Sequence, residues 1–266
     1  MDWAPFDAAR YQRDLATRAI GRFLVYRTET DTTMVLARRE ADEGAPHGTL
    51  VLAEAQTAGR GRRGRSFHSP AGENLYFTMV LRLPEGQHRR LPIVVPLAVA
   101  RACAAEGVDA RIKWPNDIWI GERKTCGMLI DAEVTPGGAV AFPGIGINVN
   151  GDPTVIPELR EIATSLARER GRPVDREALL ARICNELEWL LRRDDQSLAA
   201  AYRGMSMILG REVVVEPGGN EPAYRGHAEE IEPDGSLRVR LADGAANVVR
   251  AADVTVRPSG EGGAAG

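Results

Sequence analysis

Two lysines are unusual in this chain, because almost every other basic position is an arginine. Of the 34 lysine and arginine residues, 32 are arginine, and the two lysines, Lys113 and Lys124, both lie in the stretch KWPNDIWIGERK. A lysine carries a compact ammonium group that the planar guanidinium of arginine does not imitate. The alternative is that two lysines persist by chance, but their proximity favours a site that needs a point charge.

The segment KWPND, residues 113–117, places a cation and a carboxylate beside a tryptophan and a proline. Opposite charges interact more strongly in apolar surroundings than in water. An isolated pair of this spacing is more often a structural ion pair at a strand end. Lys124 follows a tight turn and can return to the same place, where its ammonium would hold a carboxylate against a phosphorus centre.

A second candidate for chemistry is the stretch AGRGRRGRS, residues 58–66, with four arginines and three glycines. Its glycines match the dinucleotide pattern GxGxxG and nearly match the Walker phosphate pattern, but both patterns need a helix directly afterwards. The following residues contain Ser, Pro and Gly and then alternate like a strand, so we reject both interpretations. A phosphate-binding loop, a nucleic-acid patch and a solvated loop remain open. Glycine backbone and guanidinium groups together can bind phosphate.

The composition is that of an ordinary globular protein, with 266 residues and a formal net charge of −3. A nucleic-acid function would therefore depend on the arginine stretch alone. The three cysteines form no CxxC pair and the four histidines are scattered, so we expect no structural metal. No GxSxG motif supports a serine nucleophile. The charged N-terminus is no signal peptide and no run reaches membrane-spanning length, so we expect a cytoplasmic protein without membrane contact.

The elements that would position these residues alternate between helices and strands. Strands are expected at residues 23–27, 49–55, 74–83, 110–120 with a break at Pro115, 125–134 and 139–150, and helices at 8–20 behind Asp7, at 32–41 behind Thr32 or Asp31, and at 91–106. This order predicts an α+β fold with a mixed, mostly antiparallel sheet and flanking helices. Residues 165–207 look helical, and short strands with Gly, Pro and Asp-Gly turns follow. We expect a catalytic domain at 1–207, a small β-barrel at 208–257 and a disordered tail at 258–266.

The ordered series EAQTAGRGRRGR, NLYFTMVLRL, KWPND, a lone lysine before TCG, and GIGINVN resembles the biotin protein ligases. The resemblance implies a class II synthetase-like catalytic domain followed by an SH3-like barrel. It also implies a two-step reaction. The biotin carboxylate attacks the α-phosphate of ATP, with Mg²⁺, and a lysine on a biotin carboxyl carrier domain of a carboxylase then attacks the biotinyl-adenylate. A monomer or weak homodimer that binds no nucleic acid is expected.

The same resemblance implies roles for individual residues. Lys124 would bridge the biotin carboxylate and the α-phosphate, Asp117 would receive the carrier lysine, and Arg62 would close the arginine loop on the substrates. Biotin contacts fall on Thr32, Thr33, Gln56, Arg60, Gly61, Arg62, Lys124 and Gly127. Nucleotide contacts fall on Arg62, Arg65, Lys113, Asn116, Lys124 and Asn148. No residue is assigned to a metal.

The chain departs from the usual family pattern at Met34, Phe67 and Cys126, where asparagine, tryptophan and a small residue are common. Only about 28 residues precede the ETDTTM segment, which is too short for the DNA-binding domain of some family members, so we expect a ligase without repressor function. Two alternatives stay open. One is a lipoate ligase or octanoyl transferase of the same broad fold, and the other is a nucleic-acid-binding module that uses the arginine stretch.

Overall fold

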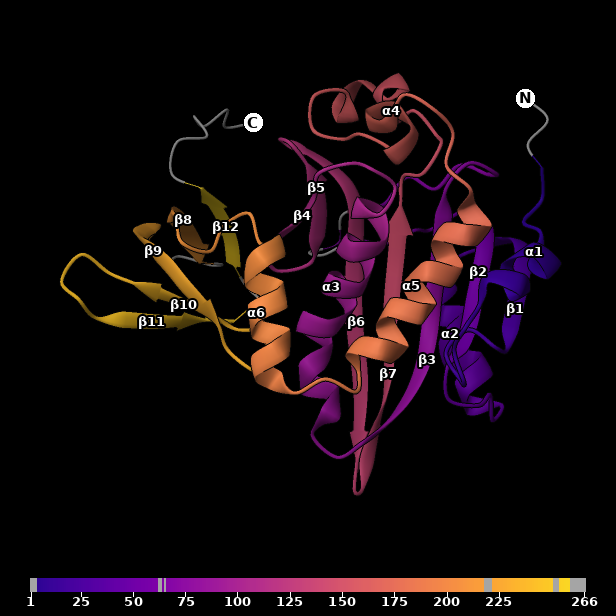
Figure 1. Ribbon diagram of the computed structural model, residues 1–266, viewed down its shortest axis with the longest axis horizontal. Coiled ribbons are helices and arrows are strands. Elements are labelled where there is room, and N and C mark those ends of the chain that lie inside the picture. The colour runs from indigo at the N-terminus through magenta and orange to yellow at the C-terminus, as the bar shows by residue number, and fades with distance from the viewer. Residues whose placement is uncertain (1–3, 62–63, 65, 218–221, 251–253, 259–266) are drawn as a thin grey trace.

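The computed structural model of the chain contains two β-sheets with helices packed against the larger one (Figure 1). It describes residues 4–61, 64, 66–217, 222–250 and 254–258. The strands of the larger sheet are β1 (Leu24–Thr30), β2 (Thr49–Gln56), β3 (Leu75–Pro84), β4 (Ala110–Lys113), β5 (Asp117–Ile120), β6 (Arg123–Thr135) and β7 (Gly138–Ile147). Those of the smaller sheet are β8 (Glu212–Pro217), β9 (Tyr224–Ile231), β10 (Leu237–Arg240), β11 (Ala246–Val249) and β12 (Val254–Pro258).

The helices lie mostly between the strands of the larger sheet and after them. They are α1 (Ala8–Asp14), α2 (Thr33–Asp42), α3 (Leu91–Ala104), α4 (Leu166–Arg170), α5 (Arg176–Leu190) and α6 (Asp195–Met205), with the short 3-10 turns η2 (Gln87–Arg90), η3 (Pro153–Val155) and η4 (Pro157–Leu159). No helix in the described ranges is long and apolar enough to cross a membrane.

The strand pairing confirms the predicted fold class. The larger sheet has the order β1-β2-β3-β7-β6-β5-β4 and the smaller one β11-β10-β9-β8-β12. Among the described strands only β1 and β2 pair in parallel, and all other pairs are antiparallel. The fold is therefore α+β, with a mixed, mostly antiparallel sheet and a second, antiparallel sheet whose strands come later in the sequence. The domain bounds at 207 and 257 stay predictions, and the predicted tail lies outside the described residues from 259 onward.

The helices begin where the sequence predicts but do not all end there. Asp7 caps α1 and Thr32 caps α2 through side-chain oxygens that accept backbone N–H groups. The helix expected over 8–20 ends at Asp14. The reason lies in α5, because the Glu188 carboxylate accepts the N–H groups of residues 18–20. Those amides are satisfied without a helix.

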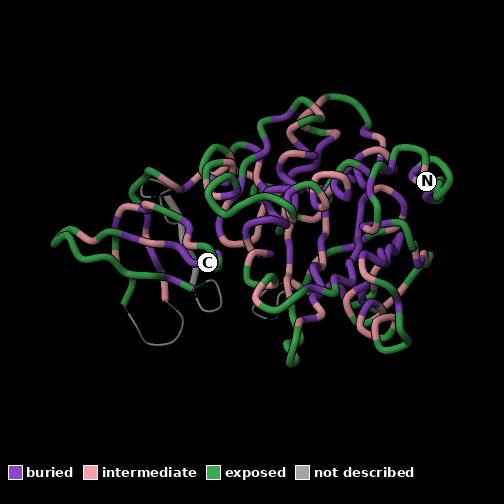
Figure 2. Tube along the Cα trace, turned by 60° about the horizontal axis from the view of Figure 1, so that its bottom comes forward, coloured by how far each residue is buried: buried purple, intermediate pink, exposed green. Residues whose placement is uncertain are grey.

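The two faces of the larger sheet are covered differently. α3 packs against β4, β5 and β6, and α5 packs against α3 on the same side (Figure 1). The other face meets α2, which contacts β2, β3 and β7 through a small apolar cluster that includes Ala37, Val51, Val80 and Phe142. Buried residues run along the strands of the larger sheet, whereas the β10–β11 hairpin is mostly exposed (Figure 2). On the α2 side, Arg38 of α2 also reaches over β7 to form ion pairs with Asp131 and Glu133 on β6.

A buried ion pair connects the N-terminal segment, the sheet and α5. Arg176 Nη1 lies 2.7 Å from Glu54 Oε2, and the two side chains are 8% and 1% exposed. Glu54 also accepts the Phe6 N–H and the Tyr26 hydroxyl proton. The carboxylate is therefore fully occupied by donors from three parts of the chain.

Replacing Arg176 with methionine should lower the free energy of unfolding by about 3–5 kcal/mol, because Glu54 would remain buried without its cation. Urea denaturation followed by circular dichroism measures this change. The matched control is Arg39→Met, which breaks an ion pair whose side chains are 74% and 57% exposed and should leave the free energy of unfolding nearly unchanged. Equal losses in the two variants would contradict a structural role for the buried pair.

The smaller sheet is attached to the larger one next to the KWPND segment. Met207 N–H donates to the Ile112 carbonyl at 3.0 Å, which extends the sheet beyond β4. The indole N–H of buried Trp114 donates to the carbonyl of Gly235, in the turn between β9 and β10, at 2.9 Å. The chain breaks between β4 and β5 at Pro115, as predicted, and the Trp114–Pro115 peptide bond is cis. KWPND is thus held from both sheets.

Candidate active site

Four sequence motifs meet in one row of residues across the larger sheet. The strand register places Lys113 opposite Asp117, Asp117 opposite Gly127, Gly127 opposite Gly146, and Gly146 opposite Tyr76. Side chains of directly opposed residues share one face of a sheet. KWPND, KTCG, GIGIN and NLYF therefore contribute to the same surface. It is the α2 side, since Thr78, two residues beyond Tyr76, contacts the first turn of α2.

Glycines leave the middle of this row without side chains. A Cβ on Gly146 would lie 2.7 Å from the Phe67 ring, and one on Gly127 would lie 2.9 Å from Lys124 Nζ. In the neighbouring row, a Cβ on Gly144 would lie 2.9 Å from the terminal methyl of Met34. We call Gly127, Gly144 and Gly146 the glycine floor. An aromatic ring, a thioether and an ammonium group lie directly on it.

Lys124 and Asp117 form an ion pair at the edge of the glycine floor. Lys124 Nζ lies 2.8 Å from Asp117 Oδ1, with the side chains 35% and 24% exposed. The pairing of β5 with β6 shifts register between Ile118 and Trp119, so that Trp119 opposes Lys124 while Ile118 opposes Cys126. Such a bulge re-aims a side chain. Here it brings Lys124 to the face that carries Asp117, which confirms that the lysine returns to KWPND.

The other lysine of the motif has a different partner. Lys113 Nζ lies 3.4 Å from the centre of the Trp119 ring, which is close enough for a cation–π interaction. Lys113 therefore lies beside Asp117 in the row, while the ion pair forms between Asp117 and Lys124. Trp119 is not among the residues predicted from the sequence. Its place opposite Lys124 depends on the bulge.

Two predicted nucleotide residues hold backbone segments around Lys124. The Asn116 amide donates to the Met128 carbonyl on β6. The Asn148 amide donates to the Thr164 carbonyl at 3.1 Å, and the backbone of Lys124 bonds to Ile162 and Thr164 on the same segment. Asn148 and Lys124 thus both form hydrogen bonds to the backbone of the same segment, residues 162–164.

The predicted biotin residues Thr32, Thr33 and Gln56 gather at the start of α2. Thr32 caps the helix, and Gln56 Oε1 accepts both the backbone N–H of Thr33 at 2.9 Å and its hydroxyl at 3.2 Å. The Thr33 hydroxyl also lies 2.9 Å from the hydroxyl of Thr78, which is fully buried. Thr78 is not among the residues predicted from the sequence. The alternation of NLYFT could have placed it on the face of Tyr76, but not next to Thr33.

The arginine stretch forms a loop whose two ends pair with each other. Arg60 and Ser66 form an antiparallel bridge, and Phe67 N–H donates to the Gly59 carbonyl at 2.9 Å. From Ser66 to the start of β3 the described chain contains no helix, so the rejection of the two helix-dependent phosphate motifs is confirmed. Gly61 lies at the loop's entry, partly buried. Arg62 and Arg65, predicted to contact the substrates, lie outside the described residues.

The cysteines offer no thiolate near this site. Burial raises the pKa of the Cys126 thiol well above its ordinary value, and it raises the pKa values of Cys103 and Cys184 to about 12. All three thiols are therefore protonated at neutral pH, and a thiolate is the nucleophilic form. Within the described ranges, no three His, Cys, Asp or Glu side chains gather in a group that could hold a metal ion.

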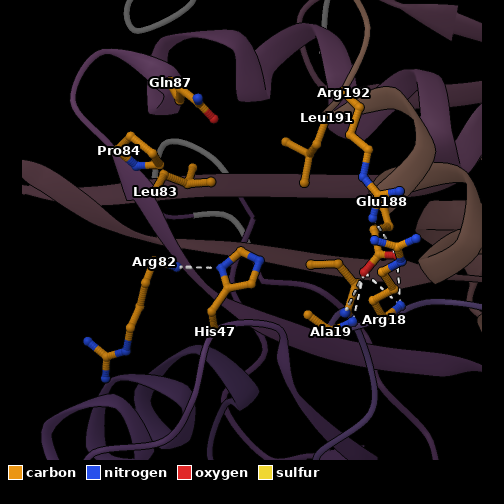
Figure 3. Close-up of a pocket in the computed structure, with 11 residues that line it drawn as sticks. Arg18, Ala19, His47, Arg82, Leu83, Pro84, Gln87, Glu188, Leu191 and Arg192 are labelled. Carbon is orange, nitrogen blue, oxygen red and sulfur yellow. Dashed lines mark hydrogen bonds and ion pairs between the residues drawn. The ribbon is translucent and has the colours of Figure 1, made fainter.

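A pocket of about 510 Å³ lies at the far end of β3, away from this row (Figure 3). Its lining includes His47, Arg82 and Glu188 but no predicted site residue. The Glu188 carboxylate already accepts backbone N–H groups, and His47 Nδ1 accepts the N–H of Arg82 at 3.1 Å (Figure 3). Glu188 and His47 of this pocket are thus already engaged in hydrogen bonds to the backbone. The row on the α2 side is therefore the better candidate for the active site.

Comparisons with known proteins agree with this choice. A model of the biotin/lipoate A/B protein ligase family matches residues 24–150. The chain is 34% identical over 234 residues to a biotin–[acetyl-CoA-carboxylase] ligase of Mycobacterium tuberculosis, with 84% of each chain covered. It is 38% identical over 174 residues to the bifunctional ligase/repressor BirA of Bacillus subtilis, covering 64% of this chain and 54% of that one. The chain thus spans about half the length of the bifunctional relatives that it matches.

Among solved structures, the fold is similar to that of a biotin protein ligase from Aquifex aeolicus in complex with biotin and ATP. The TM-score is 0.74 and the identity 26%, with 90% of this chain and all of the other covered. The similarity therefore extends over most of this chain and the whole of the other.

Proposed function

The chain belongs to the biotin protein ligase family, and from this premise we propose that it joins biotin to a carrier protein at the expense of ATP. Its likeness to a biotin–[acetyl-CoA-carboxylase] ligase over 84% of both chains supports this activity. The observation that carries it is the Lys124–Asp117 ion pair on the glycine floor. It lies on the sheet face that Thr33 contacts through Thr78, and Thr33 in turn contacts Gln56. A carboxylate, a phosphate and an amine can meet there.

In the first step, a carboxylate oxygen of biotin would attack the α-phosphorus of ATP. The new bond joins this oxygen to phosphorus, and the bond from the α-phosphorus to the bridging oxygen breaks, which releases pyrophosphate. The Lys124 ammonium has three N–H donors, so it can bind the biotin carboxylate and the α-phosphate together. It would then offset the negative charge that builds up between them.

In the second step, the ε-amine of a carrier lysine would attack the carbonyl carbon of biotinyl-adenylate. The amide bond forms, the bond between this carbon and the phosphate oxygen breaks, and AMP leaves. The amine loses a proton in this step, and the Asp117 carboxylate is the nearest acceptor in the row. Lys124 would remain beside it to balance the departing phosphate.

The two ends of the site would suit the two small substrates. Thr33, Gln56 and Thr78 offer hydroxyl and amide groups that match the N–H and C=O groups of the biotin head, while Met34 and Phe67 supply apolar cover on the glycine floor. Lys113, Asn116 and Asn148 would lie toward the nucleotide. Magnesium would enter with ATP, whose phosphates provide the oxygen ligands that it prefers.

The test is to mix the purified protein with biotin, MgATP and a biotin carboxyl carrier domain, and to weigh the carrier by mass spectrometry. We expect the carrier to gain the mass of one biotinyl group, and to gain nothing without ATP. Lipoate in place of biotin should give no product, whereas efficient lipoylation would favour the lipoate alternative. Tight, salt-sensitive nucleic-acid binding without adenylate formation would favour a binding module. The cytoplasmic location and the oligomeric state stay predictions.

A further inference from the structure

Asn74 lies between the end of β7 and the start of β3 and is only 5% exposed. Its Oδ1 atom accepts the backbone N–H groups of Val149 at 2.8 Å and Gly151 at 3.2 Å. Backbone N–H groups can only donate, so the oxygen of the side-chain amide must face them. The amide nitrogen is therefore fixed on the other side, 2.9 Å from the hydroxyl of Tyr76.

The orientation of the Asn74 amide also sets the direction of the hydrogen bond that the Tyr76 hydroxyl makes. Because it accepts a proton from Asn74, its own proton is available for the carbonyl of Pro70, which lies 3.2 Å away. Tyr76 is fully buried, and burial raises the pKa of its phenol, so the hydroxyl stays a donor at neutral pH. Hydrogen bonds thus run one way, from Asn74 through Tyr76 to Pro70.

Pro70 lies just beyond the outgoing end of the arginine loop. Its neighbour Ser69 accepts from Gln56 Nε2 at 3.1 Å and donates to the Phe67 carbonyl at 3.0 Å. The Tyr76 ring meets the Phe67 ring edge-on, with the centroids 6.2 Å apart. The segment from Phe67 to Pro70 is therefore fastened at two points, by Gln56 and by Tyr76.

We infer that Asn74 is a positioning residue for the ligase reaction, which orients the Tyr76 hydroxyl so that it holds the base of the arginine loop at Pro70. The inference rests on the proposed function, since the loop is useful only if its glycines and arginines bind the substrates. Asn74 itself touches neither substrate in this account. It acts on biotin binding through Tyr76 and the loop base.

The experiment compares Asn74→Asp with Tyr76→Phe. The aspartate keeps both acceptor bonds to residues 149 and 151 but has no N–H for Tyr76, and the phenylalanine removes the hydroxyl. Both variants should raise the KM for biotin in adenylate formation about five- to tenfold, with a smaller change in kcat, as expected when one buried hydrogen bond is lost. The double variant should be no worse than the poorer single one, because both changes break the same connection.

The matched control is Asn150→Asp. Asn150 also bonds a backbone carbonyl and N–H, both of Val174, at the same end of the sheet, and neither bond involves Tyr76 or the loop base. It should keep the wild-type KM for biotin. A purely structural role for Asn74 would reduce the folded fraction and so lower kcat while KM stays constant.

An unchanged KM in both Asn74→Asp and Tyr76→Phe would overturn the inference, as would additive effects in the double variant. Failure of the proposed function gives a different result, since the wild-type protein would then form no biotinyl-adenylate at all.

Discussion

Lys124→Arg keeps a positive charge at its position, yet we expect it to lower the rate of adenylate formation by at least about a hundredfold. The ammonium lies 2.8 Å from Asp117 Oδ1 and 2.9 Å from the place of a Cβ on Gly127. A planar guanidinium is wider and longer, so it cannot occupy this position without displacing Phe67 or Asp117. Biotin-dependent release of pyrophosphate measures the rate directly.

The control for this variant is the neighbouring cation. Arg123 forms an ion pair with Glu169 at 2.7 Å, away from the glycine floor. Arg123→Lys should therefore retain nearly the full rate of pyrophosphate release. Near-normal turnover of Lys124→Arg would remove Lys124 from the mechanism, whatever the control does.

The second large effect is expected from Gly127→Ala. The new methyl group would lie 2.9 Å from Nζ of Lys124, closer than real Cβ atoms approach, and 3.0 Å from its Cε, which is already a tight contact. The end of a lysine side chain can swing away at little cost, so the protein should fold and melt normally. The ammonium would then leave Asp117, and we expect adenylate formation to slow by about ten- to a hundredfold. Single-turnover kinetics and a thermal melt separate the two effects.

Gly204→Ala is the matched glycine control. Gly204 lies in α6, and a Cβ there would meet no atom within 4 Å. Alanine is the better helix former by about 1 kcal/mol, so this variant should be as active as the wild type and slightly more stable. If Gly127→Ala formed adenylate at the wild-type rate, the absence of a side chain at position 127 would not be what positions the Lys124 ammonium.

Much of the fold could be predicted from local patterns. Asp7 and Thr32 cap helices because their side chains satisfy free N–H groups, and β3 and β7 follow from alternating or apolar runs. The length of α1 could not be predicted, since it depends on Glu188, about 170 residues away in the chain. The start of a helix can be predicted from a capping residue nearby in the sequence. Its end is harder to predict when it depends on a residue far away in the sequence.

The candidate site was predicted in part. Motif order identified Lys124, Asp117, Thr33 and Gln56, and the structure brings them together in two contacting pairs. Thr78, Trp119 and Asn74 were missed because their neighbours are set by strand register, which one sequence does not reveal. The roles of all the predicted site residues stay predictions, and Arg62 and Arg65 also lie outside the described part of the chain.

The bulge between β5 and β6 makes the number of residues in this hairpin a functional property. Removing one residue between Asp117 and Lys124, or adding one, would turn the lysine toward the face that Ile118 and Cys126 share with α3. Its charge would then be buried among apolar side chains, while every residue of the two motifs remained present. Insertions and deletions at this hairpin should therefore be selected against more strongly than substitutions in its turn.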